Sequence, residues 1–325
     1  MELTGKICVT GASGFIGSNF IRYLLKNYPE VNIVGINRFS SQKNLRRLDD
    51  VINNPRFYMY YADFAKDPIT EAMDKVNYVV HLGGKTMVDF SIRDPEPFIE
   101  SNVVGTYKIL EEIRRNKSTI KKGLVFSTDE VLGSITTGSY KEDARLNPSN
   151  PYSSTKACSE MLTLGYKNTY DLPLVISRAE NVYGYYQGAE KMLPVSIKRA
   201  TAGENILVYG TGKNVRQWIF IDDVCTAIVK LLEAGVPGET YNIAGNRELT
   251  NLELAHRILN AMRLPLDKIS FIPDHEIRPG HDFRYALNNE KIKSLGWEPR
   301  VDLDEGIAKV VKWYTSEEGK KWTSV

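Results

Sequence analysis

Short apolar runs alternate with amphipathic stretches through the first half of the chain. Helices are predicted at residues 15–27, 96–116 and 152–170, because apolar residues recur there three and four positions apart. Strands are predicted for KICVT (6–10), NIVGI (32–36), RFYMYYA (56–62), YVVHL (78–82), GLVFST (123–128) and LVISRA (174–179). Strands separated by helices of this length pair in parallel through right-handed crossovers. The pattern therefore predicts an α/β fold built on a doubly wound parallel sheet.

The rhythm changes after residue 183, where turn-rich pieces such as VYGTGKN and IRPGHDF alternate with short helices, including 222–234 and 251–262. This change indicates a smaller C-terminal α/β lobe, from which IFIDD and YNIAG return to the first lobe. The predicted division is a first domain of residues 1–182 plus roughly 217–243, and a second of roughly 183–216 and 244–325.

The composition of the chain limits the kinds of partner that the protein is expected to bind. The 325 residues carry 42 basic and 40 acidic side chains, scattered among each other, for a net charge of +2, so neither nucleic acid nor an anionic membrane surface is an expected partner. Three distant cysteines and four histidines form no metal-binding pattern. No apolar run reaches the ~18 residues typical of a membrane span, and the N-terminus does not resemble a signal peptide. A cytoplasmic location is expected.

A glycine-rich turn follows the first predicted strand. Gly11, Gly14 and Gly17 separate KICVT from the first predicted helix. Such glycines close the turn, let the backbone approach a pyrophosphate and let the helix pack on the strand, while the helix N-terminus faces the anion. Turns of this kind can also serve packing alone, but the strand before it and the helix after it predict a Rossmann-type dinucleotide site.

The residues after the second predicted strand bear on the choice of cofactor. An NAD site usually offers a carboxylate to the ribose roughly 20 residues after the glycines. Asn37, Arg38 and Ser40 stand there instead, and an arginine without a carboxylate favours the 2′-phosphate of NADP. The alternative is a solvated Arg38 with Asn37 bonding to plain NAD. Asp63, after the third strand, would lie near the adenine or simply cap a turn.

Tyr152 and Lys156 lie four residues apart on one face of a helix that Pro151 can begin. An ammonium at this spacing can lower the pKa of the phenol, which would let Tyr152 exchange a proton with a sugar hydroxyl. The same spacing recurs at Tyr209 and Lys213, but the glycines between them make a turn. Context therefore selects Tyr152, with an exposed helical pair as the alternative.

Asp129 and Glu130 stand side by side just past the predicted strand GLVFST. Two adjacent carboxylates at the end of a buried strand repel each other, so a chemical use for both is the question they raise. A solvated acidic turn or a helix cap is the structural alternative.

Several stretches together resemble a known family. TGASGFIG, YSSTK and RAENVYG resemble the extended short-chain dehydrogenase/reductase family over essentially the whole chain. Within that family, STDEV, EKMLP, YGTGKNVRQWIFIDD and RPGHDFRYALNNEKIKSLGW are most similar to the nucleotide-sugar 4,6-dehydratases that act on dTDP-glucose. Relatives that epimerise or decarboxylate usually lack the Asp-Glu pair after the threonine. The resemblance implies an NAD(P)-dependent lyase with a dinucleotide-binding and a nucleotide-sugar-binding domain.

The resemblance also implies a role for each catalytic candidate. Tyr152 takes the 4-hydroxyl proton as the nicotinamide oxidises C4, Glu130 removes the C5 proton, and Asp129 protonates the departing 6-hydroxyl. Return of the hydride to C6 then gives a 4-keto-6-deoxyhexose. Thr128 would hydrogen-bond the 4-hydroxyl. Asp129 must be protonated and Glu130 ionised, and close like charges push two carboxyl pKa values apart.

The binding sets follow from the resemblance in the same way. The cofactor set, completed by Tyr152 and Lys156, is Gly11, Gly14, Phe15, Ile16, Gly17, Asn37, Arg38, Ser40, Asp63, Phe64 and Leu82. The substrate set is Thr86, Asn181, Glu190, Lys191, Tyr209, Arg216, Asn251, Arg278 and His281. Arg216, Arg278 and His281 would donate to the diphosphate. Individual members can instead be ordinary surface side chains.

Several residues depart from the dTDP-glucose pattern. Gly83 and Gly84 replace alanines, Lys85, Thr86 and Met87 replace Glu, Ser and His, and Leu132, Glu180, Val182 and Leu207 replace Tyr, Ser, Asn and Pro. These positions surround the sugar and the base more than the chemistry. The base and hexose stay open: dTDP-glucose is favoured, with UDP-glucose or another donor as alternatives. GINRFSSQKNLRRL is similar to GDP-mannose 4,6-dehydratase, which uses NADP, whereas the overall resemblance favours NAD.

Two other functions compete with the dehydratase. A nucleotide-sugar epimerase or 5,6-dehydratase would share the binding site and the first oxidation. A nicotinamide-sensing regulatory protein would keep the fold without needing Tyr152, Lys156, Asp129 and Glu130. For assembly, a homodimer is expected, because the family pairs the helices near 96–116 and 152–170 and both stretches are apolar on more than one face.

Overall fold

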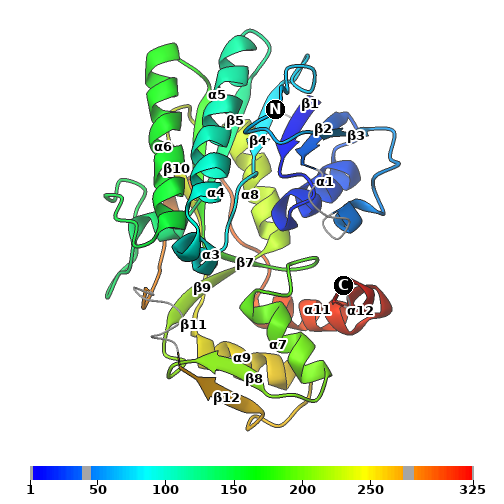
Figure 1. Ribbon diagram of the computed structural model, residues 1–325, viewed down its shortest axis with the longest axis vertical. Helices are drawn as coiled ribbons and strands as arrows, with labels where there is room; N and C mark the ends of the chain where they lie inside the picture. Colours follow the sequence, from blue (N-terminus) through cyan, green and yellow to red (C-terminus); the bar gives the residue numbers. More distant parts are fainter. Residues whose placement is uncertain (1–2, 39–44, 274–281, 324–325) are drawn as a thin grey trace.

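A seven-stranded parallel sheet forms the upper part of the molecule (Figure 1). The computed structural model describes residues 3–38, 45–273 and 282–323, so Ser40, Arg278 and His281 lie outside the described residues. The strand order is β10-β6-β5-β4-β1-β2-β3. The strands are β1 (Gly5–Thr10), β2 (Val31–Asn37), β3 (Phe57–Tyr61), β4 (Tyr78–His81), β5 (Lys122–Thr128), β6 (Leu174–Ala179) and β10 (Thr240–Ile243).

The predicted fold class is confirmed, and the six strands predicted for the sheet agree with it to within about a residue at each end. All residues of β4 and β6 are buried, which explains why these strands read as continuous apolar runs. The strand order reverses between β1 and β4. In open parallel sheets the crevice outside the carboxyl ends of the strands at such a reversal is the place where ligands bind.

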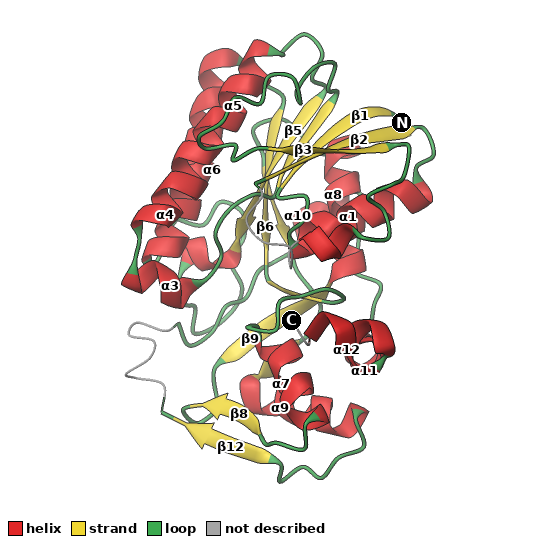
Figure 2. Cartoon of the chain, turned by 45° about the vertical axis from the view of Figure 1, so that its right-hand side comes forward, coloured by secondary structure: helices red, strands yellow, loops and turns green. Residues whose placement is uncertain are grey.

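Helices cover both faces of this sheet (Figure 2). On one side lie α1 (Phe15–Asn27) and α8 (Ile221–Ala234), and on the other α5 (Gly105–Arg115) and α6 (Pro151–Tyr170). The helix predicted at 96–116 is instead built from α4 (Glu96–Phe98), a π-helical turn at Ile99–Val104 and α5. The Asn102 carbonyl in that turn accepts the hydroxyls of Thr106 and Ser159. Periodicity cannot show such an interruption or these contacts.

The lower part of the molecule contains two small sheets, one of β7 (Asn181–Tyr183), β9 (Val215–Phe220) and β11 (Glu248–Thr250), the other of β8 (Ile206–Tyr209) and β12 (Ile269–Ile272). Its helices are α7 (Met192–Thr201), α9 (Asn251–Ala261), α11 (Leu303–Thr315) and α12 (Glu317–Thr323). The short helices α3 (Val88–Arg93) and α10 (Glu290–Ser294) complete the chain. YNIAG returns to the large sheet as β10, whereas β9, which holds the start of IFIDD, pairs with β7 and β11. The division into two domains stays a prediction.

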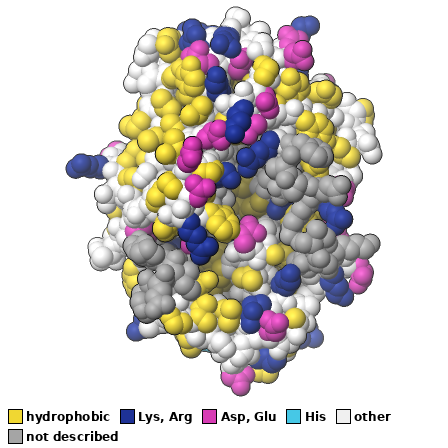
Figure 3. Space-filling model, viewed as in Figure 1, with side chains coloured by type: hydrophobic (Ala, Val, Ile, Leu, Met, Phe, Trp, Pro, Cys, Tyr) yellow, Lys and Arg dark blue, Asp and Glu magenta, His cyan; other side chains and the backbone are white. Residues whose placement is uncertain are grey.

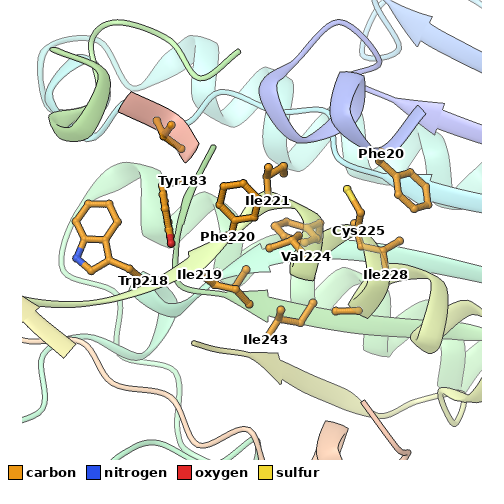
Figure 4. Close-up of a cluster of buried hydrophobic side chains, with 14 of the residues drawn as sticks. Phe20, Tyr183, Trp218, Ile219, Phe220, Ile221, Val224, Cys225, Ile228 and Ile243 are labelled. Carbon is orange, nitrogen blue, oxygen red and sulfur yellow. The ribbon is translucent and has the colours of Figure 1, made fainter. Parts of the chain in front are cut away.

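One apolar core runs from the large sheet into the lower part (Figure 4). Phe20 of α1, Tyr183 of β7, Phe220 of β9, Ile228 of α8 and Ile243 of β10 are each at most 1% exposed. Burial of a side chain of this size contributes about 1.5 to 3 kcal/mol. Because this core lies beneath the carboxyl ends of the strands, it fixes the two parts of the molecule around the crevice above it. Over the described ranges, no helix is both long and apolar enough to cross a membrane.

Candidate active site

A cleft of about 740 Å³ lies at the carboxyl ends of the large sheet, where the two parts of the molecule meet. Figure 3 shows the surface hollowed in this region. Every predicted site residue within the described ranges lines it: Gly11, Gly14, Phe15, Ile16, Gly17, Asn37, Arg38, Asp63, Phe64, Leu82, Thr86, Thr128, Asp129, Glu130, Tyr152, Lys156, Asn181, Glu190, Lys191, Tyr209, Arg216 and Asn251. The fold thus brings together residues that are as much as 240 positions apart, Gly11 and Asn251.

The glycine-rich turn forms one end of the cleft. Gly11 has a φ of +67°, and a Cβ there would lie 2.8 Å from the Cα of Gly83. A Cβ on Gly17 would lie 2.3 Å from the carbonyl oxygen of Gly11, so neither position has room for a side chain. Helix α1 begins after Gly14 without a side-chain cap, which leaves backbone N–H groups for a ligand. These features fit the pyrophosphate of a dinucleotide.

Arg38 and Asp63 lie beside each other at the end of β2 and β3. One guanidinium nitrogen of Arg38 is 3.8 Å from Asp63 Oδ2, while Asp63 Oδ1 accepts the N–H of Ala65 at 3.1 Å. Asn37 donates its amide to the carbonyl of Arg38 at 2.7 Å. Asp63 therefore caps a turn and also places a carboxylate next to Arg38, so a 2′-phosphate at this point would meet both charges.

A buried polar network fixes the backbone beneath the middle of the cleft. Thr10 Oγ1 accepts the N–H of Gly83 at 3.0 Å and lies 2.7 Å from His81 Nδ1. His81 Nε2 lies 3.1 Å from the hydroxyl of Thr106, which donates to the carbonyl of Asn102. Burial lowers the pKa of His81 to about 3, so the ring is neutral. The sequence analysis placed His81 in a predicted strand and gave it no role in the site.

Tyr152 and Lys156 are set by the start of α6. Asn150 caps the helix through the N–H of Ser153 at 2.9 Å, and Pro151 occupies its first turn. Lys156 Nζ donates to the carbonyl of Phe126 at 2.6 Å, and burial lowers its pKa to about 8. Burial and the charge of Glu130 raise the pKa of Tyr152. The pKa of Tyr152 is thus raised, which contradicts the expectation that Lys156 lowers it.

Thr128 ends β5 and positions the first of the two adjacent acids. Its hydroxyl donates to Asp129 Oδ1 at 3.0 Å and accepts the N–H of Glu130 at 3.4 Å. Asp129 is 4% exposed, and its Oδ2 has no hydrogen-bond partner among the described residues. Burial and the neighbouring Glu130 raise the pKa of Asp129 to about 7. Asp129 thus keeps a proton at a pH where an ordinary aspartate has lost it.

Glu130 has different surroundings. Burial raises its pKa, whereas the cations Lys191 and Arg216 lower it. Because two cations oppose the effect of burial at Glu130, the negative charge of the pair falls on Glu130 and the proton on Asp129. The geometry therefore supplies one acid and one base at adjacent positions, and Tyr152 lines the same cleft.

Arg216 braces the far wall of the cleft. It donates to the carbonyls of Val215 at 2.7 Å and Asp282 at 2.8 Å, and its guanidinium lies 4.5 Å from the ring centre of Tyr285. The carboxylate of Asp282 in turn accepts the hydroxyls of Tyr285 and Ser149, both at 2.5 Å. Arg216, a predicted anion contact, also holds the backbone of the segment that carries Asp282 and Tyr285.

Sequence reasoning missed several polar residues of the cleft. Arg47 is one: it is 7% exposed and donates to the carbonyls of Tyr186 at 2.9 Å and Ser13 at 3.3 Å, next to the glycine-rich turn. The other polar lining residues missed are Ser13, Asp89, Ser101, Ser127, Asn150, Gln187, Arg199, Trp218, Asp282 and Tyr285. Several of these residues lie on regular elements, such as Ser127 on β5, Trp218 on β9 and Arg199 on α7, but a single polar side chain creates no periodicity, so no pattern in the sequence marks them.

Comparison with known proteins places the chain among nucleotide-sugar enzymes. A family model described as GDP-mannose 4,6 dehydratase matches residues 8–310. The chain is 40% identical over 316 residues to a dTDP-glucose 4,6-dehydratase of Actinoplanes sp., covering 95% of this chain and 97% of that relative. The crystal structure of dTDP-glucose 4,6-dehydratase from Bacillus anthracis in complex with NAD is 36% identical, covers 98% of both chains and has a TM-score of 0.89.

The fold by itself does not separate dehydratases from epimerases. The structure of UDP-glucuronic acid 4-epimerase from Bacillus cereus, in complex with UDP-glucuronic acid and NAD, also has a TM-score of 0.89. Its identity is 26%, and it covers 97% of this chain and 99% of its own. The reaction must therefore be argued from the residues in the cleft.

Proposed function

Because the chain belongs to the GDP-mannose 4,6 dehydratase family, we propose that it is a nucleotide-sugar 4,6-dehydratase, a hydro-lyase that removes one water from a nucleotide-diphospho-hexose. The observation that carries this proposal is the Asp129 and Glu130 pair, in which burial keeps a proton on Asp129 while two cations favour the ionised form of Glu130. Removal of a proton and of a hydroxyl from neighbouring carbons requires one base and one acid side by side.

NAD is the proposed cofactor. The relative of known structure from Bacillus anthracis was crystallised with NAD, and the glycine-rich turn here lies beside an uncapped helix N-terminus that can receive a pyrophosphate. Gly11, Gly14 and Gly17 would hold its pyrophosphate, and Lys156 its nicotinamide half. When bound there, NAD would supply the hydride transfer that the reaction needs, oxidation at C4 of the sugar and reduction at C6.

The chain's own residues would move the protons. Tyr152 takes the proton of the 4-hydroxyl, with Thr128 beside it. Glu130 then removes the proton from C5, the electron pair of that bond forms the C5–C6 double bond, and the C6–O bond breaks. Asp129 gives its proton to the departing hydroxyl, so that one water leaves. The product is an NDP-4-keto-6-deoxyhexose.

The donor is proposed to be dTDP-glucose, because relatives named dTDP-glucose 4,6-dehydratase match nearly the whole chain. Within the described ranges, the residues that would bind it are Thr86, Asn181, Glu190, Lys191, Tyr209, Arg216 and Asn251. Lys191 and Arg216 offer positive charge to a diphosphate. UDP-glucose is the next donor to consider, since Lys85 and Leu207 at the cleft differ from the dTDP-glucose pattern.

Incubation with a panel of donors tests the proposal. The purified protein is mixed with dTDP-glucose, UDP-glucose, CDP-glucose, GDP-mannose or UDP-N-acetylglucosamine, and the mass of each product is measured by mass spectrometry. Loss of one water from one donor, with a 6-deoxy product, is the expected result. A product of unchanged mass would instead identify an epimerase, and water loss that leaves no 6-deoxy sugar would identify a 5,6-dehydratase.

We also propose that the protein is a homodimer. Figure 3 shows hydrophobic side chains gathered on the surface where α5 and α6 lie. Covering such side chains with a second subunit is favourable by about 25 cal/mol per Å² of apolar area removed from water. The exposed apolar residues of this region are Phe90, Ile92, Ile99, Val104, Tyr107, Met161 and Tyr170.

Light scattering should give twice the chain mass. Met161→Lys should weaken the dimer, whereas Phe271→Lys, on β12 in the other lobe, should leave it intact.

A further inference from the structure

The loop between β7 and α7, residues 184–191, contains a strained residue that other parts of the chain hold in place. Tyr186 has a φ of +61°, a left-handed conformation that residues with a side chain rarely adopt. Its carbonyl accepts Arg47 Nε at 2.9 Å, and the guanidinium of Arg22 lies 4.0 Å from the centre of its ring. Strain of this kind persists only where the surroundings fix it, and it is typical of segments that position a ligand.

The next residue of this β7–α7 loop is fixed as well. The carbonyl of Gln187 accepts the hydroxyl of Tyr314, on α11, at 2.7 Å and the indole N–H of Trp322, on α12, at 3.1 Å. The loop ends at Glu190 and Lys191, and both residues line the cleft. The position of the loop therefore decides where these two side chains would meet a nucleotide sugar.

Arg47 connects the β7–α7 loop to the glycine-rich turn. Its Nη1 donates to the carbonyl of Ser13, within that turn, at 3.3 Å, while its Nε donates to the carbonyl of Tyr186. The guanidinium also lies 4.4 Å from the ring centre of Trp322. Arg47 is 7% exposed and lines the cleft, and although burial lowers its pKa to about 10, it keeps its charge at neutral pH. One planar group thus joins the turn that would hold the pyrophosphate to the loop that would contact the sugar.

We propose that Arg47 is a positioning residue that holds the glycine-rich turn against the β7–α7 loop, so that the dinucleotide and the nucleotide sugar bind between walls fixed to each other. The inference rests on the proposed function for the identity of these two ligands. Without the bridge, the left-handed Tyr186 loses the bond to its carbonyl, and the turn and the loop can move apart. Because a preformed site binds more tightly than one that must first be ordered, their separation weakens the binding of both ligands.

Arg47→Met tests the bridge, since methionine keeps an unbranched apolar stem without the donors. NAD and a nucleoside diphosphate, dTDP or UDP, are titrated separately into purified protein freed of bound nucleotide, and binding is measured by calorimetry. Both dissociation constants should rise by about 10-fold or more, the lower end of the range for loss of a hydrogen bond to a charged group. A rise for NAD alone, or for neither ligand, overturns the proposal, because a bridge acts on both walls.

Arg56→Met is the matched control. Arg56 is a partly buried arginine that also donates to two backbone carbonyls, those of Tyr28 at 2.9 Å and Val31 at 3.2 Å. It is not among the described residues that line the cleft. The control should lower the melting temperature, as Arg47→Met does, but leave both dissociation constants near those of the parent. Equal weakening of binding in the two variants would reflect a general loss of stability and overturn the proposal.

Arg47→Lys separates the bridge from the charge. Lysine keeps the positive charge but places it on a single nitrogen, which lacks the fixed fork that reaches both carbonyls. Arg47→Lys should therefore resemble Arg47→Met in both titrations. Recovery of the parent affinities in Arg47→Lys would assign the effect to charge alone and overturn the bridge.

Hydrogen exchange keeps this test separate from the proposed function, because it needs neither ligand nor turnover. In Arg47→Met, amide exchange followed by mass spectrometry should become faster in peptides that cover the turn at 11–17 and the loop at 184–191. In Arg56→Met it should become faster around 28–31 instead. Unchanged exchange in the turn and the loop of Arg47→Met overturns the proposal. If no donor loses water, the proposed function fails, and the exchange still decides whether Arg47 holds the turn and the loop together.

Discussion

Replacement of Glu130 by glutamine separates the two halves of the proposed reaction. Glutamine keeps the size and shape of glutamate but cannot accept the C5 proton. Oxidation at C4 uses Tyr152 and should survive, whereas removal of water should stall. The variant should therefore convert the donor to its 4-keto form and stop before a 6-deoxy product appears.

The structure gives the direction of each effect. Loss of a general base costs ~10² to 10⁴ in rate, or about 3 to 5 kcal/mol in the barrier to elimination. The charge of Glu130 also raises the pKa of both Asp129 and Tyr152, so its removal lowers both. A lower pKa at Asp129 leaves less of the acid protonated and slows elimination further. A lower pKa at Tyr152 favours the phenolate and does not slow oxidation.

Oxidation at C4 and loss of water can be measured separately. Absorbance of reduced nicotinamide should rise when donor is added to Glu130→Gln and then persist, while mass spectrometry finds little dehydrated product. In deuterated water the parent enzyme should place deuterium at C5 of its product, because the final protonation at C5 draws on solvent. Turnover by Glu130→Gln within a few-fold of the parent would remove Glu130 from the role of base, and an acidic turn would then be the first alternative.

Three further predictions concern neighbouring groups. Tyr152→Phe should abolish the oxidation itself, so that adding donor leaves the nicotinamide absorbance flat; a normal absorbance rise would contradict the role of Tyr152. Arg38→Ala should weaken binding of NADP by on the order of 1.5 to 3 kcal/mol and change NAD little, because only NADP places a phosphate there; equal effects in a fluorescence titration would refute the phosphate contact. Asp129 has a pKa of about 7 in the folded protein against about 4 when unfolded, so the folded state binds the extra proton and the parent loses stability as pH rises between these values. Asp129→Asn should therefore gain melting temperature over the parent as pH rises from about 4 to about 7, and a pH-independent difference would be evidence against the raised pKa.

The regular part of the fold was open to sequence reasoning. Strands such as β4 and β6 are buried on both faces, so each reads as an unbroken apolar run between helices. The π-helical turn at Ile99–Val104 was not predicted, and neither was the contact of the Asn102 carbonyl in it with the hydroxyls of Thr106 in α5 and Ser159 in α6. Periodicity reports which side of a helix is buried, not which carbonyl a distant side chain contacts.

The candidate site was predictable to the extent that its residues belong to motifs. Gly11, Tyr152 and Asp129 each stand in a short stretch with a recognisable spacing, and all three line the cleft. Arg47 was missed, since its partners Ser13 and Tyr186 come from distant segments, and their proximity is a long-range property that neither segment encodes by itself.

The residues proposed for the chemistry lie in a different part of the cleft from two of the residues that differ from the dTDP-glucose pattern. Thr128 and Asp129 are fixed at the end of a paired strand, where the hydrogen-bonded ladder leaves little freedom. Lys85 and Leu207, which differ from the dTDP-glucose pattern, lie elsewhere, Lys85 in the loop after β4 and Leu207 in β8 of the other lobe. Substitutions at such positions can change the base or hexose that fits while leaving the acid and base in place. A donor other than dTDP-glucose in the panel would therefore leave the predictions for Glu130 and Tyr152 unchanged.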